Sequence, residues 1–145
     1  MAVFDPDRLT QKMQAGLQAS HVLAEQRKHS EIDVVHLLIS LLADREGIGP
    51  ALLSAAGVDL QKAQRELEKA LASKAQLSST TGVQLKISRE LYDLLGAADG
   101  LAQQLKDEYI SVEHVLLAAA RSNPILKTLG ITEESLQEGL KAVRG

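Results

Sequence analysis

The chain repeats its own sequence, and this constrains its fold more than any other feature. Residues 9–38 recur as residues 87–116 without a gap, at a constant offset of 78 residues. A five-residue deletion then shifts the register, which returns at Gly57-Val58-Asp59 and Gly130-Ile131-Thr132. The positions identical in both copies, numbered in the first, are Leu17, Ala19, Leu23, Ala24, Gln26, Lys28, Ile32, Val34, His36 and Leu38. Self-similarity of this kind is typical of a duplicated structural unit, so we expect two copies of one unit.

Each copy is expected to begin with a long amphipathic helix. Asp5 is a suitable N-cap and Pro6 suits the first helical position, which predicts a helix over about residues 6–28. In the second copy, Ser88 stands at the start of a matching segment that runs to about Lys106. Apolar residues recur in both segments at the 3.6-residue period of a helix with one buried face.

Three shorter helices are expected to follow in each copy. Equivalent positions carry residues that start or end helices, namely capping side chains, prolines of the first turn and glycines that follow the last turn. In chain order these pairs are Asp33 and Ser111, Pro50 and Pro124, Gly57 and Gly130, and Asp59 and Thr132. The helices after Asp33 and Ser111 are predicted to end near residues 44 and 120. No segment alternates long enough to predict a sheet.

The predicted fold class is therefore all-α, with eight helices. Two four-helix repeats related by a pseudo-two-fold axis should form one compact domain over residues 1–145, since a chain of this length can bury a core of ordinary size. Repeat one covers about residues 6–71 and repeat two about residues 87–145. Between them, residues 72–86 are polar and rich in turn-forming residues, which predicts a linker.

Composition and motifs argue against several classes of function. The absence of cysteine excludes disulfides and thiolate metal sites and fits a cytoplasmic protein. A net charge of −3 with dispersed Lys and Arg argues against a nucleic-acid partner. No secretory signal is recognisable, and the longest nearly apolar run, residues 34–42, is too short for the roughly 20 residues that span a membrane. Phosphate-loop, hydrolase-elbow and His-Glu-x-x-His motifs are absent, so we expect no catalytic residue and no cofactor in this chain.

Two histidines, His36 and His114, stand three residues after equivalent caps. Catalysis by both would need a neighbouring carboxylate in each copy, but Val35 occupies the position of Glu113. Glu25 and His29 have the four-residue spacing of a helical pair of metal ligands, but a solvated pair of side chains explains that spacing. We therefore interpret His36 and His114 as structural residues and expect no metal site.

Positions that are apolar in only one copy are not required by the shared fold. In the second copy they include Tyr92, Leu94, Leu105 and Tyr109, which replace Gln14, Gly16, Arg27 and Glu31. These side chains either pack the repeat interface or line a binding groove on the second copy. Tyr109 lies close to Asp107, Glu108 and Glu113, and an aromatic anchor with an acidic rim would suit peptides that combine apolar and basic residues. The acids could instead serve the helix that follows, because negative charge stabilises a helix N-terminus.

The motifs also resemble a known family. The motif Asp7-Arg8-Leu9-Thr10-x-Lys12-x-Gln14, the block from Lys106 to His114 and the segment Val143-Arg144-Gly145, together with the double repeat, resemble the N-terminal (Clp repeat) domain of the ClpB family of AAA+ protein disaggregases. The resemblance covers essentially the whole chain and favours ClpB over ClpA, ClpC and ClpV.

This resemblance implies a substrate-binding role. In the family, the domain is attached to a homo-hexameric AAA+ motor, binds exposed apolar segments of unfolded or aggregated proteins and passes them to the motor. ATP and Mg²⁺ belong to motor domains absent from this chain, so the chain is not expected to be an enzyme, and the isolated domain is expected to be monomeric. The substrate-binding positions implied by the resemblance are Thr10, Asp107 and Glu113, with the leucine-rich second long helix, although Thr10 could instead bond locally within the first helical turn. The comparison of the two copies adds Tyr109. The leucines concerned are Leu91, Leu94 and Leu95.

The alternative is an adaptor-docking module of a ClpC-, ClpA- or ClpV-type unfoldase. At one position this sequence departs from the ClpC type in a way that affects this alternative. Members of the ClpC type use paired acidic sites in both repeats for phosphorylated arginine, whereas this chain has Val35 where the first of these acids would stand.

Overall fold

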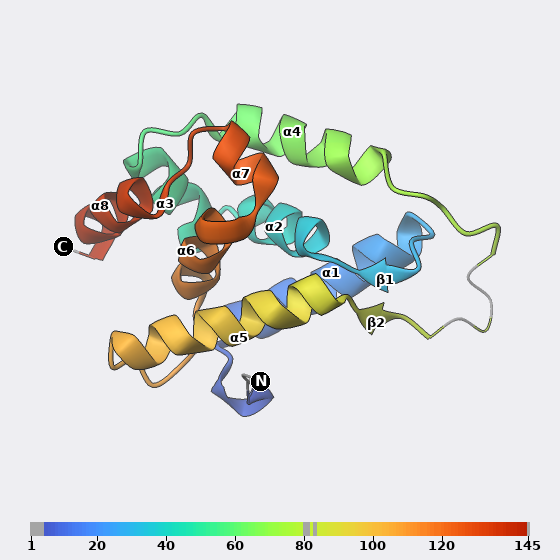
Figure 1. Cartoon of the computed structure of the whole chain (residues 1–145), viewed down its shortest axis with the longest axis horizontal. Coiled ribbons are helices and arrows are strands. Elements are labelled where there is room, and N and C mark those ends of the chain that lie inside the picture. Colours follow the sequence, from blue (N-terminus) through green and yellow to red (C-terminus); the bar gives the residue numbers. More distant parts are fainter. Residues whose placement is uncertain (1–4, 80–81, 83, 145) are drawn as a thin grey trace.

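The computed structural model describes residues 5–79, 82 and 84–144. In this part, the first repeat consists of α1 (Gln11–Gln26), α2 (Val34–Ala43), α3 (Ile48–Ala55) and α4 (Leu60–Ala72), and the second of α5 (Arg89–Gln104), α6 (Val112–Ser122), α7 (Pro124–Thr128) and α8 (Glu133–Arg144) (Figure 1). The predicted all-α fold with eight helices is confirmed. The predicted linker includes Thr80, Thr81 and Val83, which lie outside the described residues.

The N-terminal boundary of the first helix differs from the prediction. Asp5 caps only a short 3₁₀ turn, η1 (Pro6–Arg8), and the next residue is extended. The long helix α1 begins at Gln11, and its N-cap is Thr10, whose hydroxyl accepts the N–H three residues on at 3.2 Å. Ser88 caps α5 in the same way at 3.0 Å. The two long helices therefore start at equivalent positions of the repeat.

Most of the other predicted boundaries agree with the structure. Gly57 and Gly130 adopt positive φ values of 80° and 77° where α3 and α7 end, a conformation that glycine reaches without steric cost. The helix α7 begins at Pro124 as predicted, whereas α3 begins at Ile48, two residues before Pro50.

Each repeat pairs its leading segment with the other repeat. Two short strands, β1 (Glu31–Ile32) and β2 (Lys86–Ile87), run parallel with Ile32 opposite Ile87. A separate parallel bridge joins Leu9 to Ile110. Leu9 is equivalent to Ile87 and Ile32 to Ile110, so the two contacts obey the pseudo-two-fold relation. Pairs this short produce no alternating pattern that the sequence could have revealed.

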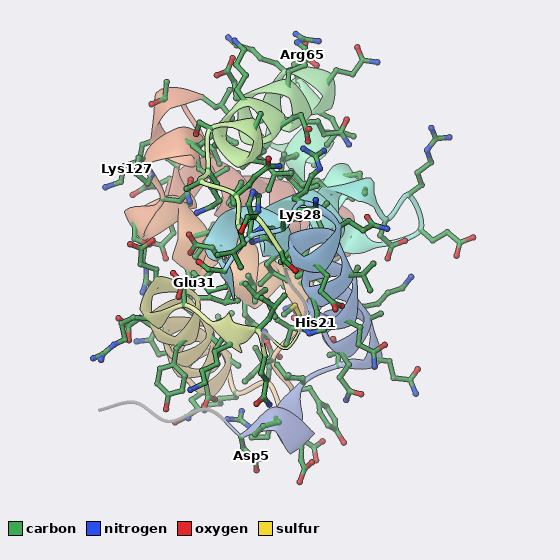
Figure 2. The ribbon with its side chains drawn as sticks, turned by 90° about the vertical axis from the view of Figure 1, so that its right-hand side faces the viewer. Asp5, His21, Lys28, Glu31, Arg65 and Lys127 are labelled. Atoms are coloured by element: carbon green, nitrogen blue, oxygen red, sulfur yellow. The ribbon has the colours of Figure 1, made fainter. Side chains whose placement is uncertain are left out.

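Both long helices end in the same left-handed turn. Lys28 and Lys106 have φ values of 59° and 60°, so the helices stop before the ends predicted from the sequence. Figure 2 shows Lys28 and Glu31 on the connection that follows α1. The N–H groups of His29 and Asp107 then bond to carbonyl oxygens of the last helical turns at 2.9 and 2.8 Å. This turn places residues 29 and 107 beside the next helix of their repeat.

The fourth helix of the second repeat packs on the first repeat. Helices α3 and α8 lie together at one end of the molecule (Figure 1). Gly139 of α8 allows this approach, since a Cβ atom there would lie 3.0 Å from the Leu52 carbonyl oxygen and from the Ala56 nitrogen. None of the helices in the described part of the chain is long and apolar enough to cross a membrane.

Candidate functional site

The leucines predicted to bind substrate lie in the core. Leu91 and Leu95 are fully buried and Leu94 is 5% exposed. Leu91 and Leu95 are therefore closed off from a ligand, whereas Leu94 lines an open cavity of ≈ 490 Å³ together with Glu90, Asp93 and Pro124. The apolar residues of α5 form a stripe because that face of the helix packs inside the molecule. Leu94 belongs to this packed face although its equivalent in the first repeat is a glycine, Gly16.

The polar residues implied by the resemblance lie near one another but are engaged within the molecule. Thr10 and Glu113 line a cavity of ≈ 240 Å³ between the N-termini of α1 and α6. The Glu113 carboxylate forms an ion pair with Arg144 of α8, and Arg144 also lies 3.7 Å from Asp107. Burial opposes the charge of Glu113, but hydrogen bonds from Ser111 and Arg144 outweigh it and lower the pKa of this carboxyl. Of the three acids expected to form a rim, Glu113 is therefore buried and paired, Asp107 is partly buried and Glu108 is exposed.

Two of the four named residues that are apolar only in the second copy remain exposed. Leu105, the C-cap of α5, is 48% exposed, and Tyr109 is 50% exposed. Tyr92 is partly buried and has interactions within the protein. The two exposed side chains among these four both lie after the end of α5.

Leu105 belongs to an open groove of ≈ 490 Å³ between α5, α6 and α8, which we call the α6–α8 groove. Its apolar lining consists of Leu101, Leu105, Leu117 and Leu140. Its polar lining consists of Gln104, Gln137, Arg121, Lys141 and Arg144. A concave apolar surface with a few polar groups at its edge is the usual form of a ligand-binding site.

The first repeat has an equivalent groove. The α2–α4 groove, of ≈ 460 Å³, is lined by Ile39, Ala43, Gln61, Gln64, Arg65 and Glu68. Four of these residues occupy the repeat positions of residues that line the α6–α8 groove. The equivalent pairs are Ile39 and Leu117, Ala43 and Arg121, Gln64 and Gln137, and Glu68 and Lys141.

An ion pair distinguishes the two grooves. At the end of α1, Arg27 bonds to Glu68 of α4 with an N–O distance of 2.6 Å. The equivalent residues of the second repeat are Leu105 and Lys141, which cannot form such a pair. Lys141 instead bonds to Glu138 of its own helix. The end of α5 is therefore not tied to α8 by this pair, and an apolar side chain stands where the first repeat has a charged one.

The two repeat histidines cap helices. The Nδ1 atoms of His36 and His114 accept the backbone N–H groups of Asp33 and Ser111, each at 2.9 Å. A neutral ring that accepts at Nδ1 carries its proton on Nε2. Burial, reinforced by the charges of His29 and Lys74, lowers the pKa of His36 to about 4. Within the described residues, no cluster of three His, Cys, Asp or Glu side chains could hold a metal ion.

Comparison with known proteins identifies the family. Residues 8–130 match the family described as the Clp repeat (R) N-terminal domain. The chain belongs to this family. The ClpB chaperone of Bacillus cereus is 32% identical over 147 residues, and that of Pseudomonas putida is 36% identical over 143 residues. These matches cover 97% and 96% of this Clp repeat domain, but the domain spans only 17% of the length of either chaperone.

Solved structures show the same fold. The N-terminal domain of Hsp104 from Candida albicans has a TM-score of 0.81 at 20% identity, with 94% of this chain and 91% of that chain covered. A ClpV N-domain in complex with a VipB peptide has a TM-score of 0.76 at 22% identity, with 94% and 87% covered. At these identities the likeness shows the fold of the Clp repeat domain and not its ligand.

The α6–α8 groove was only partly predictable. Comparison of the repeats identifies Leu105, because its counterpart is Arg27. Lys141 carries a different signal, a reversal of charge, since its counterpart is Glu68. Leu117 and Leu140 are apolar in both copies and therefore look like ordinary core residues in the sequence. Only the structure shows that they also line an open groove.

Proposed function

We propose that this Clp repeat domain is the substrate-binding module of a ClpB-type chaperone, and that it binds exposed apolar segments of unfolded or aggregated proteins in the α6–α8 groove. The observation that carries the proposal is the open groove itself, in which four leucines are brought together and Leu105 is half exposed. The ClpB relatives support the assignment of the parent protein.

Weak binding would suit this role. Full burial of a leucine side chain stabilises a complex by about 1.5–3 kcal/mol, and Leu105 is already half buried, so it would contribute about 1 kcal/mol. A segment held by a few such contacts dissociates readily and can be transferred. In this proposal, transfer, ATP and Mg²⁺ binding and hexamer formation belong to motor domains of a cytoplasmic parent protein, and the domain alone is a monomer without catalytic activity.

A pair of matched substitutions tests the groove. Leu105→Asp places a charge on the apolar lining, whereas Val22→Asp changes a residue of α1 that is equally exposed, at 49%. We expect Leu105→Asp to weaken the binding of a labelled unfolded protein about fivefold, the loss that corresponds to about 1 kcal/mol. Val22→Asp should bind as the unchanged chain does. Circular dichroism should show equal helical content in all three proteins.

Tyr109→Asp provides a further control, because Tyr109 is exposed but does not line the groove. If Leu105→Asp binds the unfolded protein as tightly as the unchanged chain, the groove proposal is wrong. A loss with Tyr109→Asp alone would place the binding surface elsewhere on the second repeat.

A second candidate function is docking of an adaptor. The solved complex of a ClpV N-domain with a VipB peptide favours it, because that neighbour binds a segment of a defined partner. The two candidates differ in selectivity. A titration that compares one folded partner with an unfolded model protein separates them, since an adaptor-docking module should bind the folded partner and leave the unfolded protein free.

A further inference from the structure

We propose that the α6–α8 groove prefers segments that carry carboxylates beside their apolar residues. This inference rests on the proposed function and adds the chemical class of the ligand. It follows from the charges that line the groove and from the way their partners are arranged.

Cations line the groove and acids do not. Arg121, Lys141 and Arg144 all belong to its lining, and no carboxylate is among the described residues that line it. Their partners Glu133, Glu138 and Glu113 lie outside the lining. The positive end of each pair therefore borders the groove, and a ligand carboxylate would meet cations there.

Lys141 is the cation most available to a ligand. Its side chain is 75% exposed, and its contact with Glu138 is 3.4 Å long and equally exposed. Exposed pairs of this kind contribute little, so a ligand carboxylate can replace Glu138 at small cost. Arg121 and Arg144 are held more firmly, since Arg121 lies 2.7 Å from Glu133 and Arg144 pairs with the buried Glu113. They would add positive potential at fixed positions.

The other groove shows that this charge is not imposed by the fold. The α2–α4 groove has one cation, Arg65, and one acid, Glu68, in its lining. Glu68 occupies the repeat position of Lys141, so the two grooves have opposite charges at the same place. The preference also opposes the net charge of the chain, −3, which would by itself favour basic ligands.

Three labelled peptides test the inference. They share the same apolar residues and differ at flanking positions, which are Asp and Glu, Ser and Gln, or Lys and Arg. We expect the acidic peptide to bind most tightly and the basic one least. Each carboxylate contact should give about a fivefold advantage over the neutral peptide, from the Coulomb energy of two charges 4 Å apart in water. Added salt should reduce the difference.

Two lysine variants locate the effect. Lys141→Glu should remove most of the advantage of the acidic peptide over the basic one, because only Arg121 and Arg144 then remain as cations of the lining and both are held by their own glutamates. Lys69→Glu is the control, because Lys69 is also 75% exposed, also bonds to a glutamate three residues earlier on its helix, and does not line either groove. It should leave the order unchanged.

The outcomes separate the two proposals. Equal affinities for the three peptides, lost with Leu105→Asp but unaffected by Lys141→Glu, would overturn the charge preference and leave the proposed function intact. Tighter binding of the basic peptide would also overturn the charge preference and leave the proposed function intact. If none of the peptides binds, the proposed function and the charge preference are both wrong.

Discussion

At the scale of single residues, equivalent histidines are held by different partners. In the first repeat, the Nε2–H group of His36 donates to Nδ1 of His29 over 2.8 Å. In the second, the Nε2–H group of His114 donates to a carboxylate oxygen of Asp107 over 2.7 Å. The first histidine therefore sits against a group that can itself become positive, and the second against an anion. Burial and the charges of His29 and Lys74 lower the pKa of His36, so this ring resists protonation.

This difference predicts a pH dependence of stability. An unfolded histidine has a pKa of about 6.5, whereas the pKa of folded His36 is about 4, so the unfolded chain binds more protons between these values. The stability that His36 contributes is complete above pH 6.5 and is lost as the pH falls toward 4, by up to roughly 3 kcal/mol. Urea unfolding followed by circular dichroism at several pH values between 7.5 and 4 measures the loss.

His29→Asp provides the control for this pH dependence. It gives His36 the partner that His114 has, while Lys74 and Asp33 remain around the ring. A carboxylate favours the protonated ring, so the loss of stability over the same pH range should be smaller than in the unchanged chain. Equal losses in the two proteins would contradict the assignment to the buried histidine pair.

At the scale of helices, the duplication has produced two grooves that differ at their charged edge. Arg27 and Glu68 join α1 to α4, whereas Leu105 and Lys141 leave α5 and α8 unjoined by such a pair. Surface pairs of this kind are worth only about 0–1 kcal/mol in stability, so the exchange costs the fold little. It changes the character of the surface much more, because it replaces a charged side chain with a leucine.

The pair can be transferred to the second groove. In the double variant Leu105→Arg and Lys141→Glu, the new side chains should bond as Arg27 and Glu68 do. We expect the unfolding free energy to change by less than about 1 kcal/mol. Binding of the unfolded model protein should fall at least fivefold, because about 1 kcal/mol of apolar contact is removed. Isothermal titration calorimetry measures the affinity for the unfolded model protein. Retained binding would show that Leu105 and Lys141 do not distinguish the grooves.

At the scale of the whole molecule, the repeats depend on contacts that cross between them. Each leading segment pairs with the other repeat, and α8 packs on α3 through Gly139. The groove is bordered by α8, so its shape depends on this packing as well as on the second repeat.

Two glycine variants test the packing of α8. In Gly139→Ala, the new methyl group would press on backbone atoms of α3, which cannot rotate away as a side chain can. We expect a loss of roughly 1–3 kcal/mol in unfolding free energy. In Gly100→Ala, on α5, nothing lies within 4 Å of the added atom, and alanine should stabilise the helix by about 0.5–1 kcal/mol. Thermal unfolding measures both, and the same sign for the two changes would refute this account.

The predictions from sequence succeeded where the signal was local. Caps such as Ser88 and Asp59, and glycines such as Gly57, act within a few residues of their position, so their pattern predicted the helices correctly. The first helix begins later than its local pattern predicts, because Asp5 and Pro6 also suit a 3₁₀ turn. Pairing of Leu9 with Ile110, 101 residues away, keeps the chain extended between the turn and α1.

For the candidate site too, the sequence predicts the features that depend on local pattern and not those that depend on distant contacts. The sequence by itself determined a duplicated, all-helical chain and an excess of apolar residues in its second half, since periodicity and repeat comparison need no distant contact. Only the tertiary structure decided which of these residues face outward. Leu91 and Leu95 are sealed in the core, whereas Leu105 joins Leu117 and Leu140 at an open groove. Exposure depends on which helices pack against a side chain, and α8 reaches this place only because the folded repeats hold it there.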